Sequence, residues 1–169
     1  MSELDPESAD FAAQVDALAG GWVRAMGLRY TRATRDAVDA ELTVDASHLQ
    51  PYGLVHGGVY CSIVESIASV GAAMDSMRRG QWVVGVENHT RFLKGVRSGR
   101  LIGRGRPETI GEREISWVVN IHDADEQLVA TGRMVARVLP KGTRIGGVEV
   151  GVPGVLPDAP RVDSPTEGE

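Results

Sequence analysis

A single long helical pattern, from Gly57 to Met77, constrains the fold of this chain more than any other feature. When Val59 is placed on a helical wheel, further apolar residues fall on the same side, namely Ile63, Ile67, Val70, Met74 and Met77. A helix with such a stripe must bury it against other elements. Because almost nothing else after this segment is helical, we expect strands to wrap around it.

Strand-like segments lie on both sides of this helix in the sequence. Two precede it and four follow it with short turns between them, at residues 28–34, 37–44, 82–93, 101–109, 114–122 and 128–139. Successive strands joined by short turns indicate an antiparallel meander. The sequence therefore predicts an α+β fold with one antiparallel sheet of about six strands wrapped around the central helix. A face or edge of such a sheet stays open, so we expect a second subunit to cover it.

The two ends of the chain differ from this central part. Residues 1–26 form an acidic tail and a helix that begins after Asp10 and breaks at Gly20-Gly21. This helix either packs on a surface or acts as a lid. Residues 27–139 are expected to form one domain, whereas residues 140–169 are rich in Gly and Pro and are expected to be irregular or disordered.

Composition excludes several classes of protein. The net charge of −5 argues against a nucleic-acid-binding surface. No uninterrupted apolar run approaches about 20 residues, so no membrane span is expected. One cysteine, Cys61, and an acidic N-terminus without an apolar leader favour a cytoplasmic location. One Cys and four scattered His show no metal-ligand spacing, so no metal is expected.

Candidate functional residues are densest at the start of the long helix. His56-Gly57-Gly58 leads into it, and Glu65 follows two turns later. Adjacent glycines at a helix start leave backbone N–H groups open at the positive end of the helix dipole, where a negative or polarised oxygen is stabilised. Eight residues separate Gly57 from Glu65, or about 12 Å of helix rise. Both groups of one chain are therefore too far apart to act on one carbonyl.

The element order and the string Gly53-Leu-Val-His56-Gly57-Gly58-Val-Tyr-Cys-Ser-Ile-Val-Glu65 resemble the hotdog-fold thioesterases. Within these, the similarity is to the branch of the phenylacetate-pathway thioesterases and the Arthrobacter-type 4-hydroxybenzoyl-CoA thioesterase. The segment Glu87-Asn-His-Thr-Arg-Phe-Leu93 also resembles that branch, and the likeness covers about residues 27–139. The resemblance implies an acyl-CoA thioesterase without a cofactor, assembled as at least a homodimer, with a homotetramer expected.

The resemblance also implies a role for each residue of the site. Glu65 would act as nucleophile or as general base for water, and the N–H of Gly57 would polarise the thioester carbonyl. Gln50 would place the thioester or the water, and Ser69 would support the attacking group. Together with the 12 Å rise noted above, these roles imply a shared site, with Gly57 and Gln50 from one subunit and Glu65 and Ser69 from the other.

Further residues are expected in or near the substrate site. His56 and Gly58 belong to the substrate-binding loop, where His56 is expected mainly to hold the loop through side-chain hydrogen bonds. Lys94 and Arg113 lie where related enzymes contact the nucleotide, but they fit equally well as solvated cations in turns. Asn88 is expected to face inward and to hold the loop that contains His56.

Two other functions remain open on the sequence. A hotdog hydratase or dehydratase would act on acyl-CoA or acyl-carrier-protein thioesters. Its typical loop string, an acid followed five residues later by His, would begin at Pro51 here and is absent. A non-catalytic acyl-CoA-binding module would keep the crevice but would not depend on Glu65.

Overall fold

The computed structural model describes residues 9–151, and the expectations for residues 1–8 and 152–169 lie outside this range. The helices are α1 (Ala12–Leu18), α2 (Gly21–Ala25) and α3 (Gly57–Arg78), with a 3-10 turn η1 (Ala46–His48) before α3. The strands are β1 (Arg29–Thr34), β2 (Ala37–Val44), β3 (Trp82–Phe92), β4 (Gly99–Ile110), β5 (Glu114–His122), β6 (Leu128–Leu139), β7 (Arg144–Ile145) and β8 (Val148–Glu149).

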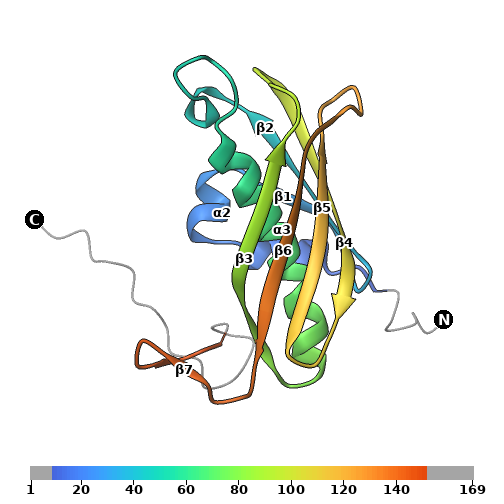
Figure 1. The fold of residues 1–169 in the computed structure, drawn as a ribbon, viewed down its shortest axis with the longest axis vertical. Helices are drawn as coiled ribbons and strands as arrows, with labels where there is room; N and C mark the ends of the chain where they lie inside the picture. The colour runs from blue at the N-terminus through green and yellow to red at the C-terminus, as the bar shows by residue number, and fades with distance from the viewer. Residues whose placement is uncertain (1–8, 152–169) are drawn as a thin grey trace, which may run out of the picture.

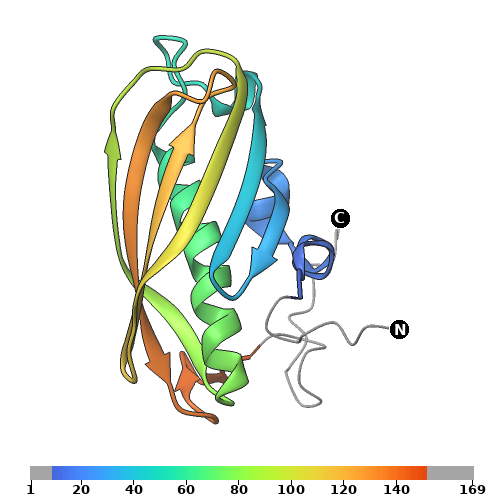
Figure 2. The ribbon, with the colours of Figure 1, turned by 90° about the vertical axis from the view of Figure 1, so that its right-hand side faces the viewer.

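Six of these strands form one antiparallel sheet in the order β1-β2-β4-β5-β6-β3. The sheet curves around α3, which runs along its concave side (Figures 1 and 2). This arrangement confirms the predicted α+β fold of six strands around one central helix. The strands β1 and β3 are the two edges of the sheet, and β7 and β8 form a separate small hairpin.

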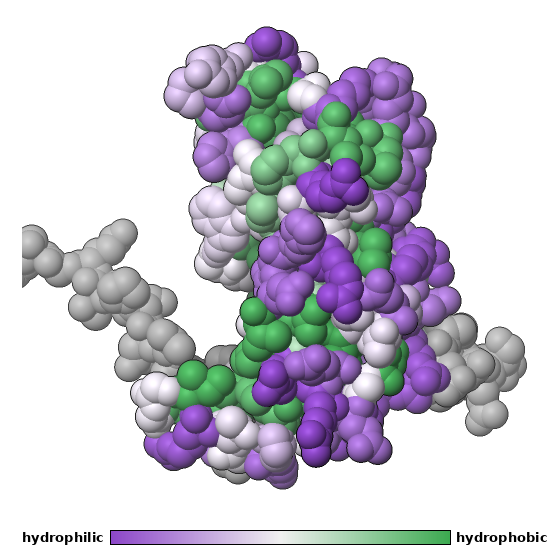
Figure 3. All heavy atoms as spheres, in the orientation of Figure 1, coloured by the Kyte–Doolittle hydropathy of each residue, from purple (hydrophilic) through white to green (hydrophobic). Residues whose placement is uncertain are grey.

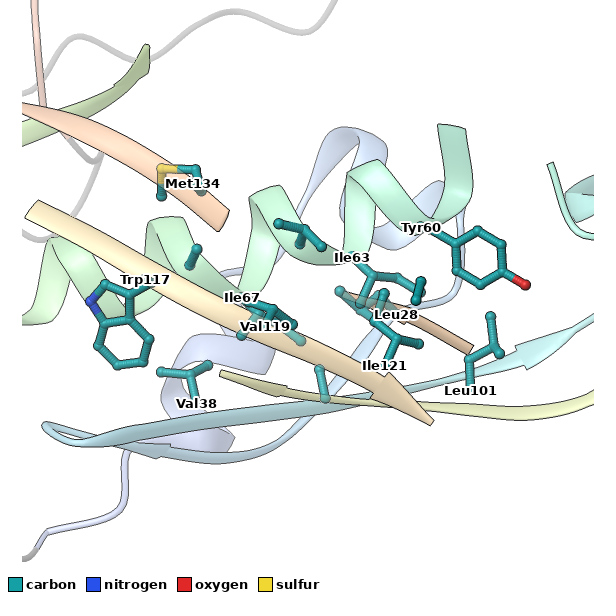
Figure 4. Packing of buried hydrophobic residues seen from close by; sticks show 14 of the residues in the cluster. Leu28, Val38, Tyr60, Ile63, Ile67, Leu101, Trp117, Val119, Ile121 and Met134 are labelled. Atoms are coloured by element: carbon teal, nitrogen blue, oxygen red, sulfur yellow. The ribbon is translucent and has the colours of Figure 1, made fainter. Parts of the chain in front are cut away.

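Close contact between α3 and the sheet depends on glycines. A Cβ on Gly103 or Gly105 of β4 would lie 2.5 and 2.4 Å from methyl carbons of Ile67. A Cβ on Gly71 would lie 2.3 Å from Cζ2 of Trp117, which is fully buried. Figure 4 shows Ile67 and Trp117 in the packed layer between α3 and the sheet. The missing side chains allow the helix to approach the strands closely.

The second half of α3 presents a different face to the sheet from the one predicted. The sheet buries Ala68 and Ala72, whereas Val70, Met74 and Met77 are only partly buried and lie on the far side of the helix. The predicted apolar stripe is therefore fully buried only from Val59 to Ile67, whereas Val70 and Met74 pack against the core without being buried in it. The fully buried Trp117 occupies the space beside Gly71, which leaves no room there for a side chain of α3.

α3 is the one helix among residues 9–151 that is long and apolar enough to cross a membrane. It instead carries the core of this fold, with nine of its residues buried. Its apolar character is explained by packing against the sheet.

The two N-terminal helices lie at the β1 edge of the sheet (Figure 2), where α1 contacts β1 directly. The predicted break at Gly20-Gly21 is present, and Gly21 has a φ of +51°, which favours glycine. Polar bonds attach α1 to β1. The N–H of Phe11 donates to the carbonyl of Ala33 (2.8 Å), and the N–H of Tyr30 donates to Oδ1 of Asp16 (2.9 Å).

Candidate active site

The first turn of α3 leaves one backbone donor open. The N-cap residue His56 accepts a hydrogen bond at Nδ1 from the N–H of Gly58 (2.9 Å), and its carbonyl accepts from the N–H of Val59 (2.9 Å). The N–H of Gly57 donates to no residue that the structure describes. The structure thus gives Gly58 a partner within the loop and leaves Gly57 as the donor for a ligand oxygen.

Gly57 also lies beneath an aromatic ring. A Cβ at this position would be 2.7 Å from Cε2 of Phe92, the last residue of β3. The Phe92 ring in turn packs against Tyr60, with ring centroids 5.8 Å apart. Burial raises the pKa of Tyr60, which therefore stays a neutral phenol beside the helix start.

Glu65 lies two turns along α3, at the border between the buried face and the open face. Its Oε2 accepts a hydrogen bond from Nδ2 of Asn88 (3.0 Å), and its Oε1 accepts from Oγ of Ser69 (3.3 Å). Ser69 is thus beside the acid, one turn beyond it. These two donors fix the direction in which the carboxylate points.

The strand β3 is shaped to accept this carboxylate. A Cβ on Gly85 would lie 2.3 Å from Oε1 of Glu65. The register of β3 against β6 also shifts between Gly85 and Glu87. A glycine and a β-bulge next to a functional side chain are the usual way to open a strand for it.

Asn88 is a site residue that the sequence placed in another role. It was expected to hold the His56 loop, but Nδ2 donates to Glu65 and to the carbonyl of Cys61 (3.1 Å). Thr90 donates to Oδ1 of Asn88 (2.7 Å), which fixes the orientation of the amide. The signal in the sequence was the alternation of β3, which brings Asn88 and Thr90 to one face of the strand.

The sequence model of the thioesterase superfamily matches residues 52–130. The Mycobacterium tuberculosis protein Rv1847, whose name assigns it provisionally as an esterase, is 40% identical over 111 residues, which are 64% of this chain and 79% of that protein. The chain belongs to the thioesterase superfamily. The proofreading thioesterase EntH of Klebsiella pneumoniae is 34% identical over 114 residues, 68% of this thioesterase and 82% of EntH. As a member of this superfamily, the chain is a hydrolase of thioesters.

Solved structures of other proteins agree with this assignment. Thioesterase HI1161 of Haemophilus influenzae superposes with a TM-score of 0.73 at 25% identity, over 79% of this chain and 94% of that one. The structure of Rv1847 gives a TM-score of 0.69 at 37% identity, over 73% of this chain and 98% of that one. Residues 52–130, which the family model matches, include the helix that carries Glu65.

The loop before α3 holds Gln50 in a tight turn of this thioesterase. Oε1 of Gln50 accepts from the N–H of Tyr52 (3.0 Å), and its carbonyl accepts from the N–H of Gly53 (2.8 Å). Behind this turn, the buried His48 links the loop to α2, since its Nε2 lies 2.9 Å from the carbonyl of Met26. The carbonyl of His48 accepts from the N–H of His56 (2.8 Å), which fixes the start of the helix.

The two cations expected to contact a nucleotide are at opposite ends of the sheet. Lys94 follows β3 near the start of α3 and is paired with Asp123 (3.1 Å) and Gln127 (2.6 Å). Arg113 is in the turn between β4 and β5, where its carbonyl accepts from the N–H of Val138 (2.8 Å). The length of β5 separates these ends, about 27 Å in strand rise. One chain therefore does not bring Lys94 and Arg113 to the same phosphate.

The carboxylate of Glu65 is held by Asn88 and Ser69, and the N–H of Gly57 is at the start of the same helix. Among residues 9–151, no group of three or more His, Cys, Asp or Glu side chains is placed to hold a metal ion. The candidate chemistry is that of a carboxylate and a backbone donor.

Proposed function

We propose that this thioesterase hydrolyses acyl-CoA thioesters with Glu65 as base or nucleophile and with the N–H of Gly57 as the carbonyl donor. The observation that carries the proposal is the open N–H of Gly57 on the same helix as an oriented carboxylate. A fixed donor at a helix N-terminus stabilises the negative charge that develops on a thioester oxygen during attack.

The reaction needs a nucleophile and a proton acceptor. In the base route, Glu65 takes a proton from water as the water oxygen bonds to the carbonyl carbon. The resulting oxyanion faces the N–H of Gly57, the C–S bond then breaks, and the proton passes to the thiolate. In the nucleophile route, the Glu65 carboxylate bonds to the carbonyl carbon, the thiolate leaves, and water hydrolyses the anhydride. Both routes give a carboxylic acid and free coenzyme A.

The 12 Å rise between Gly57 and Glu65 calls for two protomers. Within the described chain, one edge of the 11-residue strand β3 has no partner strand, and Val86 and Phe92 on β3 are 53% and 55% exposed. Antiparallel pairing of two β3 edges would place two α3 helices side by side in opposite directions. The donor of one helix would then approach the acid of the other.

The same pairing suits the substrate. Antiparallel protomers bring opposite ends of their sheets together, so Lys94 of one protomer and Arg113 of its partner are candidates for the coenzyme A phosphates. The phenylacetate and 4-hydroxybenzoyl branch is supported by the Gly53–Glu65 string and the Asn88 strand. We expect a dimer at least, and a tetramer built from it.

The Glu65→Gln variant tests the proposal. Gln keeps the shape and can still contact Asn88, but it neither accepts a proton nor attacks as a carboxylate. Release of free thiol from acyl-CoA substrates should fall by about a hundredfold or more, while binding of the same substrates is retained. Thiol release is followed with a colorimetric reagent and binding by calorimetry.

The matched control is Glu112→Gln, which removes an exposed carboxylate in the β4–β5 turn. It should hydrolyse at the parental rate. If Glu65→Gln also hydrolyses at that rate, the assignment of Glu65 is wrong. If the parent binds acyl-CoA but releases no thiol from short, long or aromatic acyl groups, the chain is a binding module instead.

A further inference from the structure

An apolar groove of about 850 Å³ begins at Glu65 and runs along α3 toward its C-terminal end. This volume is within the range of small-molecule sites. One wall is the face of α3 that is turned away from the sheet, and the other is made by α1, α2 and β1. The principal apolar lining residues are Phe11, Val15, Leu18, Val70, Met74 and Met77.

The first helix borders this groove without filling it. No residue of α1 is buried, and Phe11 and Leu18 are 41% and 60% exposed. Polar bonds to β1 hold α1 in place, since Oδ1 of Asp10 accepts from the N–H groups of Ala12 and Ala33 (2.9 Å each). Apolar side chains of α1 therefore remain available for contact with a ligand.

The polarity of the groove selects the chemical class of that ligand. Its charged groups are at its ends, with Glu65 at one and Arg35 and Arg78 at the other. Between them, the hydroxyl of Tyr30 is already used, because it donates to the carbonyl of Ser66 (3.1 Å). Burial raises the pKa of Tyr30, so the phenol is neutral. The other hydroxyl-bearing lining residues, Ser66 and Ser69, are within four residues of Glu65, so the rest of the groove is lined by apolar side chains. A ligand with polar groups along its length would lose its hydration there and find few partners.

Continuity with the catalytic acid identifies the occupant. Resting on the proposed function, we propose that the groove holds the acyl group of the substrate and that this group is a medium-length or longer apolar chain. The chain would leave the reacting carbonyl beside Glu65 and extend along α3 to Met77. These residues are twelve positions apart, or about 18 Å of helix rise.

A buried chain predicts a dependence of rate on its length. Each methylene group that enters an apolar groove should raise kcat/KM about threefold to fourfold until the groove is full. In a groove about 18 Å long, kcat/KM should therefore be at least about a thousandfold higher for a ten-carbon acyl-CoA than for acetyl-CoA. The groove and Glu65 are on the same chain. In the proposed dimer, the N–H of Gly57 that acts on the same carbonyl comes from the other protomer.

Two substitutions at different depths test this placement. Ala73 is eight residues beyond Glu65, about 12 Å in rise, and Met77 is about 18 Å beyond it. Ala73→Phe should lower the ratio of kcat/KM for the ten-carbon substrate to kcat/KM for the two-carbon substrate at least tenfold. Met77→Trp should lower kcat/KM only for the longest acyl chains, which reach the far end of the groove. The matched control is Ala17→Phe, which adds the same ring on the outer face of α1, outside the groove.

The series of straight-chain acyl-CoA thioesters from two to fourteen carbons is measured with parent and variants. An unchanged chain-length profile in Ala73→Phe overturns the inference, and a changed oligomeric state with that unchanged profile assigns the groove to a second copy instead. If the parent hydrolyses aromatic acyl-CoA but no member of this series, the inference is overturned and the proposed function stands. If the parent hydrolyses neither this series nor aromatic acyl-CoA, the proposed function fails. In that case, calorimetric binding of the same series to Glu65→Gln tests whether the groove binds the acyl chain. Affinity that does not rise with chain length overturns the inference.

Discussion

At the scale of single residues, the site depends on the absence of a side chain at two glycines. Gly57 leaves a backbone N–H open under Phe92, and Gly85 leaves space for the carboxylate of Glu65. The sequence indicated the first glycine because it stands at a helix start. The second could not be assigned, because it is 20 residues from Glu65 in sequence and only the pairing of α3 with β3 brings them together.

The open N–H of Gly57 can be removed without removing the helix. Proline is well tolerated at the first helical position, and the preceding His56 has φ −63° and ψ 137°, which proline permits. Gly57→Pro should lower kcat/KM for acyl-CoA by about a hundredfold relative to Gly57→Ala. Both variants place a Cβ against Phe92, and only the alanine retains the donor. Equal rates would exclude the N–H of Gly57 from catalysis.

At the scale of elements, most boundaries follow from hydrophobic periodicity. The strands Glu114–His122 and Leu128–Leu139 were predicted with the bounds that the structure has, and α3 differs by one residue. The face of α3 was predicted less well. A helical wheel assigns large apolar residues to the core, but Trp117 fills the space beside Gly71 and leaves no room for a side chain there. The size of a neighbouring side chain on another strand is not encoded in the periodicity of the helix.

The contact between Gly71 and Trp117 gives a test of this packing. In an exposed helix, Gly→Ala stabilises by about 1 kcal/mol. Here the new Cβ would be 2.3 Å from Trp117, so Gly71→Ala should destabilise by about 1–3 kcal/mol in urea unfolding. In the background of Trp117→Phe, which lacks the contacting atoms, the same change should cost at least about 1 kcal/mol less. If the changes in unfolding free energy of the two substitutions are additive, the strain does not arise from the contact between these two residues.

At the scale of the whole molecule, the outer face and the edge of the sheet differ in character. Ion pairs join neighbouring strands, as in Arg106–Asp39 (2.7 Å) and Arg137–Glu114 (3.0 Å), and Arg104 of β4 pairs with Glu126 of the β5–β6 turn (2.6 Å). Hydrophilic side chains predominate over the strands in Figure 3. The edge strand β3 instead exposes apolar side chains and an unpaired ladder within the described chain. Pairing through β3 is therefore favoured over stacking of the outer faces.

A charge on this edge should weaken the dimer. Val86→Lys places an ammonium group on β3, and near a two-fold axis the two copies repel each other. The dissociation constant of the dimer should rise at least about tenfold, and the specific activity should fall on dilution. Ile110→Lys changes a similarly exposed residue at the end of β4 and should leave assembly unchanged. Analytical ultracentrifugation measures both, and an active monomer of Val86→Lys would contradict the shared site.

The position of the donor and the acid on one helix has a consequence for inheritance. Under the proposed pairing, each α3 supplies the first turn of one site and the carboxylate of the other. A chain that has lost Glu65 still offers its helix start to a normal partner's carboxylate. A mixed dimer thus keeps one working site of two, and a damaged allele does not silence the normal one. Two alleles, one damaged at the helix start and the other at Glu65, would restore one complete site when expressed together.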